Sequence, residues 1–205
     1  GMTGEEILSL FYDSVLYKKN DYGWNFKPDL SYFKAKILNF DFLDSKNGKI
    51  LLTKGTKVNQ KIINEIKKKN INNFTINQES LNCLFISSDI IDEKTGKIFF
   101  EAGYEIDEIF INFLNENKIN KIDILKVDNI EIGSYIRNTL QLDKARSREE
   151  ALFEIYKILR PGEPPTIETA ENLFNNLFFN SDRYDLSSVG RLKIRAKFKN
   201  NTSID

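Results

Sequence analysis

The chain has 205 residues, 40% hydrophobic and 29% charged, a composition typical of a soluble globular protein with one ordinary domain or two small ones. Thirty basic and thirty acidic residues give a formal net charge of zero, which argues against binding to nucleic acid by bulk charge alone but allows a local basic surface. Because no apolar run approaches the roughly 18 residues that span a bilayer, we expect no membrane association.

Histidine is absent, which removes the commonest general base and the commonest transition-metal ligand. Carboxylates and lysines remain, so this absence makes an enzyme less expected without excluding one. The single cysteine, Cys83, has no partner for an internal disulfide, which points to a reducing compartment. Cys83 lies in the apolar run from Leu81 to Ile86. We therefore expect a core residue, with a reactive thiol as the alternative.

The first predicted element is an amphipathic helix. Thr3 and Glu6 have the spacing of a capping box at its N-terminus. Four apolar positions are expected on its buried face: Ile7, Leu8, Phe11 and Leu16. We assign residues 1–30 to a first, mostly helical segment.

The middle of the chain contains an internal repeat. Residues 41–76 align with residues 89–124 at an offset of 48 positions, without a gap, and 12 of the 36 pairs are identical. Chance would give roughly two to four identities in a chain of this composition, so duplication is the better explanation. The identical pairs start from Asp41, Asp44, Lys46, Gly48, Lys49, Ile50, Gly55, Ile63, Asn64, Ile71, Asn72 and Ile76. We assign residues 31–78 to repeat 1 and residues 79–126 to repeat 2.

Each repeat is predicted to begin with a hairpin. Asn47-Gly48 is a dipeptide that favours a two-residue turn with positive φ at both positions, and Thr95-Gly96 aligns with it. The runs after these turns, residues 50–52 and 98–100, have strand composition. A second glycine, Gly55 or Gly103, then breaks each strand.

A helix and a closing strand complete each predicted repeat. Asn59 and Asp107 are candidate N-caps of helices of about ten residues. The expected buried positions are Ile62, Ile63 and Ile66 in the first helix, and Phe110, Ile111 and Leu114 in the second. The closing strands are expected at residues 72–76 and 120–124.

The two repeats differ in charge. Residues 31–78 carry ten lysines and three acids, for +7, whereas residues 79–126 carry five lysines and ten acids, for −5. Neutral sequence drift on two solvent-exposed surfaces would explain this charge difference. The alternative is that one of the repeats faces an acidic neighbour. The pairs Asp41/Asp44 and Asp89/Asp92 offer fewer oxygen ligands than a calcium loop, so we place them at strand ends and expect no metal.

Residues 127–205 are predicted to be mostly helical. A short helix is expected at residues 135–142, and Ser147 with Glu150 forms a second candidate capping box. The proline-rich stretch from Arg160 to Thr166 must leave the helical conformation, and Thr166 can cap the next helix. The expected apolar faces of these two helices consist of Leu152, Ile155, Tyr156 and Leu159, then Leu173, Phe174, Leu177 and Phe178. The predicted fold class is α+β, with mostly helical segments flanking a tandem pair of small hairpin–helix–strand repeats.

Three irregular blocks resemble a known family. They are RPGEPPT at residues 160–166, ENLFNNLFF at 171–179 and DRYDLSSVGR at 182–191. In this order they resemble the bacterial RNA polymerase β subunit, and residues 3–12 resemble the helix that precedes the insertion in its lobe. The middle of the chain resembles, more loosely, the lineage-specific insertion of proteobacterial β subunits.

The resemblance implies a non-catalytic segment of the lobe, which forms a wall of the DNA cleft in transcription. It implies the other polymerase subunits (β′, α and the sigma factor) and DNA as partners, no cofactor, and a cytoplasmic, nucleoid-associated location. The metal-binding catalytic aspartates of this nucleotidyltransferase would lie on β′. Fittingly, the residues show no acidic triplet, phosphate-cradling glycine loop or nucleophile–base arrangement.

By position in the motif, Arg160 and Arg183 look like the two lobe arginines that approach the non-template strand. A guanidinium can contact a phosphate or base edge through its planar fork and can stack on an unpaired base. Prolines beside Arg160 stiffen its backbone. The alternative is that both arginines pair with nearby acids: Glu163, Asp182 and Asp185.

Residues 191–199 alternate basic and apolar side chains, a feature that does not depend on the family resemblance. As a strand, the segment from 191 to 199 would place five cations on one face: Arg191, Lys193, Arg195, Lys197 and Lys199. Such a row could follow a phosphate backbone or could protect an exposed sheet edge against aggregation. Two other functions stay open: the insertion as a docking platform for transcription regulators, and a free-standing small enzyme that uses carboxylates.

Overall fold

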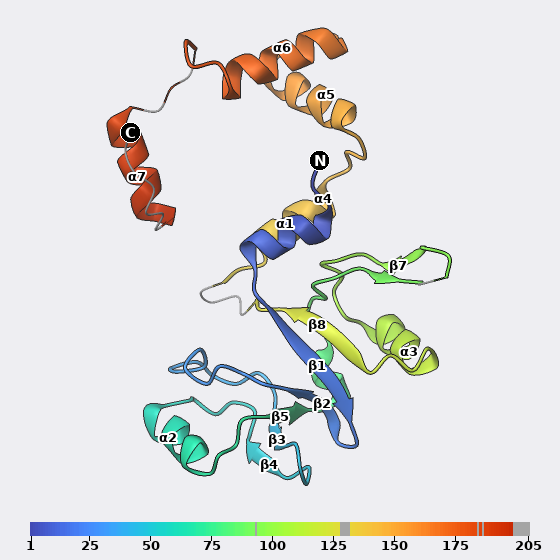
Figure 1. The fold of residues 1–205 in the computed structure, drawn as a ribbon, viewed down its shortest axis with the longest axis vertical. Coiled ribbons are helices and arrows are strands. Elements are labelled where there is room, and N and C mark those ends of the chain that lie inside the picture. Colours follow the sequence, from blue (N-terminus) through green and yellow to red (C-terminus); the bar gives the residue numbers. More distant parts are fainter. Residues whose placement is uncertain (93, 128–131, 184, 186, 199–205) are drawn as a thin grey trace. The chain divides into compact units, whose positions relative to one another are not determined.

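The computed structural model describes residues 1–92, 94–127, 132–183, 185 and 187–198, with the side chains of 197 and 198 left out. The chain divides into two compact units, Met2–Leu142 and Asp143–Asp205, with Gly1 grouped with the second (Figure 1). Each unit is described by itself.

The first unit is built on a six-stranded antiparallel sheet with the strand order β4-β3-β5-β2-β1-β8. A second sheet pairs only β6 with β7. The strands are β1 (Ser14–Asn20), β2 (Gly23–Phe26), β3 (Phe42–Asp44), β4 (Ile50–Leu52), β5 (Phe74–Ile76), β6 (Ile90–Ile91), β7 (Ile98–Phe100) and β8 (Lys121–Leu125). The helices are α1 (Gly4–Phe11), the 3-10 helix η1 (Gln78–Leu81), α2 (Gln60–Lys68), α3 (Glu108–Glu116) and α4 (Tyr135–Leu142).

The N-terminal segment is less helical than its sequence predicted. The capping box of Thr3 and Glu6 is present, but α1 ends at Phe11, and Leu16 lies in β1 rather than on the helix. The β1–β2 hairpin then runs through the middle of the first unit, between β8 and β5 (Figure 1). Tyr17, Trp24 and Phe26 on this hairpin are buried in the main core. Their burial in the sheet outweighs any local preference for helix.

A hydrogen-bond network joins α1 to α4. The Tyr12 hydroxyl donates to the Gly133 carbonyl at 3.0 Å and accepts from the Ile136 N–H at 3.2 Å. Leu8 is fully buried beside these groups. In α4, the Arg137 Nε donates to the Gly103 carbonyl at 2.6 Å. These contacts attach the helix pair to the sheet-containing part of the unit.

The same order of elements recurs after 48 residues. β3, β4, α2 and β5 are followed, at the same spacing, by β6, β7, α3 and β8. Backbone contacts recur too: Gly55 N–H donates to the Leu38 carbonyl at 2.8 Å, and Gly103 N–H donates to the Ile86 carbonyl at 2.8 Å. The sheet connections differ, because β3 pairs with β5 whereas β6 pairs with β7 alone.

The predicted two-residue hairpin turn is wrong. In each hairpin four residues connect the paired ends, with Asp44 N–H bonded to the Lys49 carbonyl and Asp92 N–H bonded to the Lys97 carbonyl, both at 2.8 Å. Among the described loop residues, the glycine alone has positive φ, +69° at both Gly48 and Gly96. The aspartate explains the longer loop, because its side chain accepts a backbone N–H two residues ahead and stabilises a wider turn.

The predicted helix caps are confirmed. Asn59 accepts from the Ile62 N–H at 3.0 Å, and Asp107 accepts from the Phe110 N–H at 2.9 Å. The apolar faces of α2 and α3 point into the core, with Ile62 only partly buried. The fully buried helix positions are Ile63, Ile66, Phe110, Ile111 and Leu114.

Cys83 is exposed, so the prediction of a core residue is wrong. Its φ is +67°, as is that of Ala35, which lies 48 positions earlier. The left-handed backbone turns the side chain of Cys83 outward, while the neighbours Leu81 and Phe85 remain buried.

The second unit consists of α5 (Arg148–Leu159), α6 (Ile167–Phe178) and α7 (Ser188–Phe198). α5 and α6 pack through the buried residues Leu152, Tyr156 and Ala170. The Ser147 cap accepts from the Glu150 N–H at 3.2 Å, but the Glu150 carboxylate accepts from the Arg146 N–H instead of the N–H of Ser147. Thr166 caps α6 as predicted.

We expect Gly23→Ala to destabilise the first unit more than Gly96→Ala. Both residues have positive φ, which costs an alanine about 1–2 kcal/mol. At position 23 the added Cβ would also overlap the backbone of Ile76 in the neighbouring strand, whereas at position 96 it would meet open space. Urea unfolding should give a loss of about 3 kcal/mol or more for Gly23→Ala. Equal losses in the two variants would contradict the close strand contact.

Candidate nucleic-acid interface

Arg160 is the C-cap of α5, at the start of a proline-rich turn. Its N–H donates to the Tyr156 carbonyl at 2.7 Å, and its carbonyl accepts from the Glu163 N–H at 3.3 Å. Gly162 has a φ of +90°, which allows the chain to reverse before Thr166 begins α6. The turn is therefore held at both ends by helix caps, and Arg160 projects from a defined backbone.

Glu163 contacts two functional groups of this turn. Its carboxylate accepts from the Tyr156 hydroxyl at 2.9 Å and lies 3.7 Å from the Arg160 guanidinium. Both side chains of the ion pair are 56% exposed, so water screens the attraction and the pair is weak. The predicted local pairing of Arg160 with Glu163 thus exists, but it leaves the guanidinium accessible to a phosphate or a base.

Arg183 lies in the turn after α6. Its N–H donates to the Asn180 carbonyl at 3.1 Å, and its side chain is exposed. Within the described residues, Arg183 forms no ion pair with Asp182 or Asp185, because Asp185 pairs with Arg191 at 2.8 Å. The local alternative therefore holds for Arg160 and not for Arg183. No contact brings the two arginines together.

The basic row lies on a helix, not on a strand, so its predicted one-face arrangement is wrong. Residues 191–198 belong to α7, whose N-terminus has Ser187 accepting from the Gly190 N–H at 3.3 Å. At 100° per residue, Arg191 and Arg195 share a side while Lys193 points away. Arg, Leu, Lys and Ala all favour helix, which explains the outcome. Lys197 and Lys199 lie outside the described side chains.

Two exposed aromatic residues were not predicted as part of a site. Phe179 is 76% exposed and Phe178 54%, although Phe178 was expected on the buried face of α6. Both precede the turn that carries Arg183. The Phe174 ring contacts them in tilted arrangements, with ring centroids at 4.9 Å from Phe178 and 5.9 Å from Phe179. Exposed rings can stack on unpaired bases. The sequence contained a signal for this exposure. Consecutive helix positions point about 100° apart, so Phe178 and Phe179 cannot both lie on the buried face.

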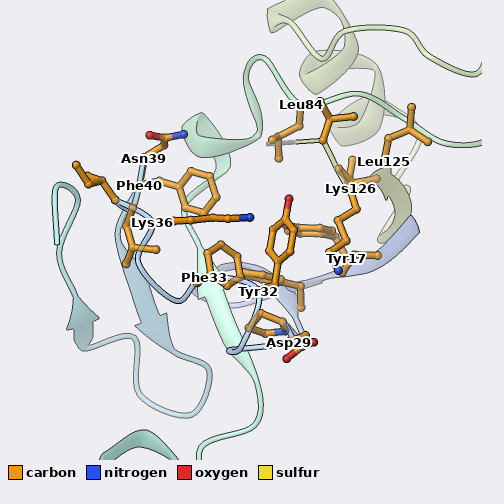
Figure 2. A pocket seen from close by; sticks show the side chains of 17 residues that line it. Tyr17, Asp29, Tyr32, Phe33, Lys36, Asn39, Phe40, Leu84, Leu125 and Lys126 are labelled. Atoms are coloured by element: carbon orange, nitrogen blue, oxygen red, sulfur yellow. The ribbon is translucent and has the colours of Figure 1, made fainter. Parts of the chain in front are cut away.

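The first unit contains a mostly apolar pocket of about 150 Å³ (Figure 2). The Tyr32 ring extends into it between two ammonium groups, with Lys36 Nζ at 3.5 Å and Lys126 Nζ at 4.2 Å from the ring centroid. At its edge, hydrogen bonds from Ser31 lower the pKa of the Asp29 carboxyl. The volume suits one aromatic ring. The described lining residues contain no nucleophile beside a base.

Among the described residues, no three His, Cys, Asp or Glu side chains come close enough to hold a metal ion. Over the same residues, no helix has the length and apolar character needed to cross a bilayer.

The hydrogen bond to Glu163 raises the pKa of the Tyr156 hydroxyl, and burial adds to the shift. A raised pKa means that the protonated tyrosine stabilises the fold. This stability is complete below the unfolded value of about 10 and is lost as the pH rises through the folded pKa. Tyr156→Phe should therefore weaken the fall in the α5–α6 unfolding midpoint as the pH rises above about 10. A pH profile identical to that of the unaltered chain would contradict this role.

Comparison with known proteins identifies the chain. The family model described as RNA polymerase Rpb2, domain 2, matches residues 109–205. DNA-directed RNA polymerase β subunits from Rhizobium rhizogenes, Bartonella tribocorum and Brucella canis are 42%, 46% and 49% identical over 197 residues, which is 96% of this chain. The match therefore includes most of residues 31–126 as well as the flanks. The chain spans only 14% of the length of these relatives. The predicted resemblance is confirmed, and over the segment that it spans the chain belongs to the bacterial RNA polymerase β subunit family.

Proposed function

We propose that this chain is a non-catalytic segment of an RNA polymerase β subunit that forms part of the DNA-cleft wall in transcription. Arg160 and Arg183 contact the non-template strand, and Phe179 provides a stacking surface beside Arg183. The other polymerase subunits (β′, α and the sigma factor) surround the segment, and β′ holds the catalytic metal ions. The complex works in the cytoplasm, at the nucleoid.

The exposure of Arg183 carries this proposal. An arginine that has no acidic partner among the described residues, on a turn fixed by Asn180, is free to bind an external anion. Arg160 supports the same role, because its exposed pair with Glu163 can exchange for a phosphate at little cost. Guanidinium groups suit both phosphate contact and base stacking.

The double variant Arg160→Ala/Arg183→Ala tests the proposal. In fluorescence anisotropy with bubble DNA at low salt, we expect its affinity to fall about tenfold, the loss of two contacts of under 1 kcal/mol each. Arg146→Ala/Arg148→Ala is the matched control, because it removes the same charge from the same unit. An equal fall in both variants would assign the binding to net charge alone. Glu163→Gln should bind more tightly than the unaltered chain, because it releases Arg160.

We further propose that residues 41–76 and 89–124 are duplicated copies of one hairpin–helix–strand unit, forming a peripheral insertion. The matching cap distances at Asn59 and Asp107 support this view, as do the equal φ angles at Gly48 and Gly96. Two unrelated segments would not be expected to share these details at a constant offset.

A second candidate function, docking of transcription regulators on the insertion, is favoured by one observation. On the outer face of α3, Ile109 is 68% exposed, and Phe99 from β7 is 43% exposed. The position matching Ile109 in α2 is Lys61, which is the ordinary choice for a solvated face. Ile109 and Phe113 are four residues apart on α3, and the Phe113 ring lies against Phe99 with centroids 4.9 Å apart, so these side chains form one apolar surface. Such surfaces are typical of protein contacts.

Ile109→Lys tests this docking. It should leave stability within about 0.5 kcal/mol, because the side chain is mostly in solvent. In assembled polymerase it should reduce recruitment of a regulator, measured by co-purification and promoter output. Asn112→Lys adds the same charge to the same helix without removing an apolar group. Docking would be rejected if deletion of residues 13–127 left recruitment and output unchanged. That deletion removes the whole sheet, whereas one of residues 31–126 would leave β1 and β2 without their neighbours.

A further inference from the structure

Eight exposed lysines lie between residues 46 and 69 of the first copy, and we call them the lysine surface. They are Lys46, Lys49, Lys54, Lys57, Lys61, Lys67, Lys68 and Lys69. All eight side chains are exposed, and Glu65 is the single acid between residues 46 and 69. In the part of the chain that the structure describes, none of the eight forms an ion pair.

The fold does not require these charges. The second copy forms the same succession of strands and helix with a lysine at only two of the eight matching positions, Lys94 and Lys97. Elsewhere it carries residues that are neutral or acidic: Ala102, Glu105, Ile109, Asn115, Glu116 and Asn117. Like charges gathered on one small unit repel one another, so the lysine surface carries an energetic cost that the second copy avoids.

The helix geometry places part of the surface on one side. Lys61 and Lys68 are seven residues apart in α2, so they share a face, and that face lies opposite the buried Ile63 and Ile66. Lys69 follows at the C-cap. Favourable interaction with the helix dipole accounts for cations in the last turn. It does not account for Lys61 in the first turn, where a cation is unfavourable.

The residue type favours a nucleic acid over an acidic protein. All ten basic residues between 31 and 78 are lysines, without a single arginine. Lysine is a strongly hydrated point charge that is depleted in the core of protein–protein interfaces, where arginine is enriched. A hydrated row of lysines suits a phosphate backbone, which binds through released counterions without requiring a dry, complementary surface.

We propose that the lysine surface of the first copy binds the sugar–phosphate backbone of duplex DNA without sequence preference. This site is separate from Arg160 and Arg183. It extends the DNA contacts of the chain to a unit that the proposed function treats as peripheral, and it does not depend on the arginines being right.

The test is fluorescence anisotropy of the full 205-residue chain with a labelled 25-base-pair duplex of mixed sequence. If about four phosphates are neutralised, affinity should fall about 100-fold between 50 and 200 mM KCl. The variant Lys57→Gln/Lys61→Gln/Lys68→Gln/Lys69→Gln should bind at least about tenfold more weakly at 50 mM KCl and lose most of the salt dependence. Circular dichroism should show a thermal midpoint no lower than that of the unaltered chain, because all four side chains are exposed and their removal relieves the repulsion.

A matched variant keeps the proposal open to refutation. Lys94→Gln/Lys97→Gln/Lys118→Gln/Lys121→Gln removes the same four charges from the second copy and should change the affinity less than about threefold. An equal loss in both variants would overturn the proposal in favour of net charge. Poly-glutamate that displaces DNA as well as unlabelled duplex of equal charge would overturn it in favour of an acidic protein. Arg160→Ala/Arg183→Ala should leave duplex binding unchanged, so failure of one site is distinguishable from failure of the other.

Discussion

The antiparallel pairing of β1 with β8 is the constraint on which the first unit depends. Five residue pairs, from Ser14 with Leu125 to Lys18 with Lys121, join segments more than 100 positions apart. Closing so long a loop costs entropy, which burial of Tyr17, Ile122 and Ile124 beside the paired backbone offsets. Once this pairing forms, the helices at the two ends of the unit, α1 and α4, become neighbours. The Tyr12 hydroxyl at the end of α1 can then bond to Gly133 and Ile136 around the start of α4.

The same closure explains how a middle region of nearly a hundred residues fits within a larger subunit. Its chain leaves and returns beside the same pair of helices, so the body between them can diverge without moving its surroundings. Residues 41–76 and 89–124, which we propose to be two copies of one unit, differ on their outer surfaces. The first copy exposes Lys61 where the second exposes Ile109, although both positions lie on equivalent helices with equivalent caps. The same succession of strands and helix thus tolerates different surface side chains.

The second unit combines a rigid turn with accessible cations. Helix caps at Arg160 and Thr166 hold the proline-rich turn, so binding there requires little ordering of the backbone. Glu163 links this turn to the helix through Tyr156 while leaving the Arg160 guanidinium on the surface. Arg183, without such an acid, is the more available of the two, and the neighbouring Phe179 adds a ring that sequence reasoning overlooked.

Local chemistry by itself determined much of this protein. Thr3, Asn59, Asp107 and Thr166 cap helices as predicted, because a cap needs only one side chain and an N–H two or three residues ahead. The aligned glycines located both hairpins, and the irregular blocks around Arg160 and Arg183 pointed to the family. Tertiary structure decided the rest. The β1–β2 hairpin owes its conformation to β5 and β8, strands distant in sequence. The outward position of Cys83 depends on one left-handed residue inside an apolar run. The alternating basic and apolar residues from Arg191 are compatible with a strand or with a helix. A strand needs a partner strand to pair with, and the sequence pattern carries no information about such a partner, so only the tertiary structure shows that the segment is helical.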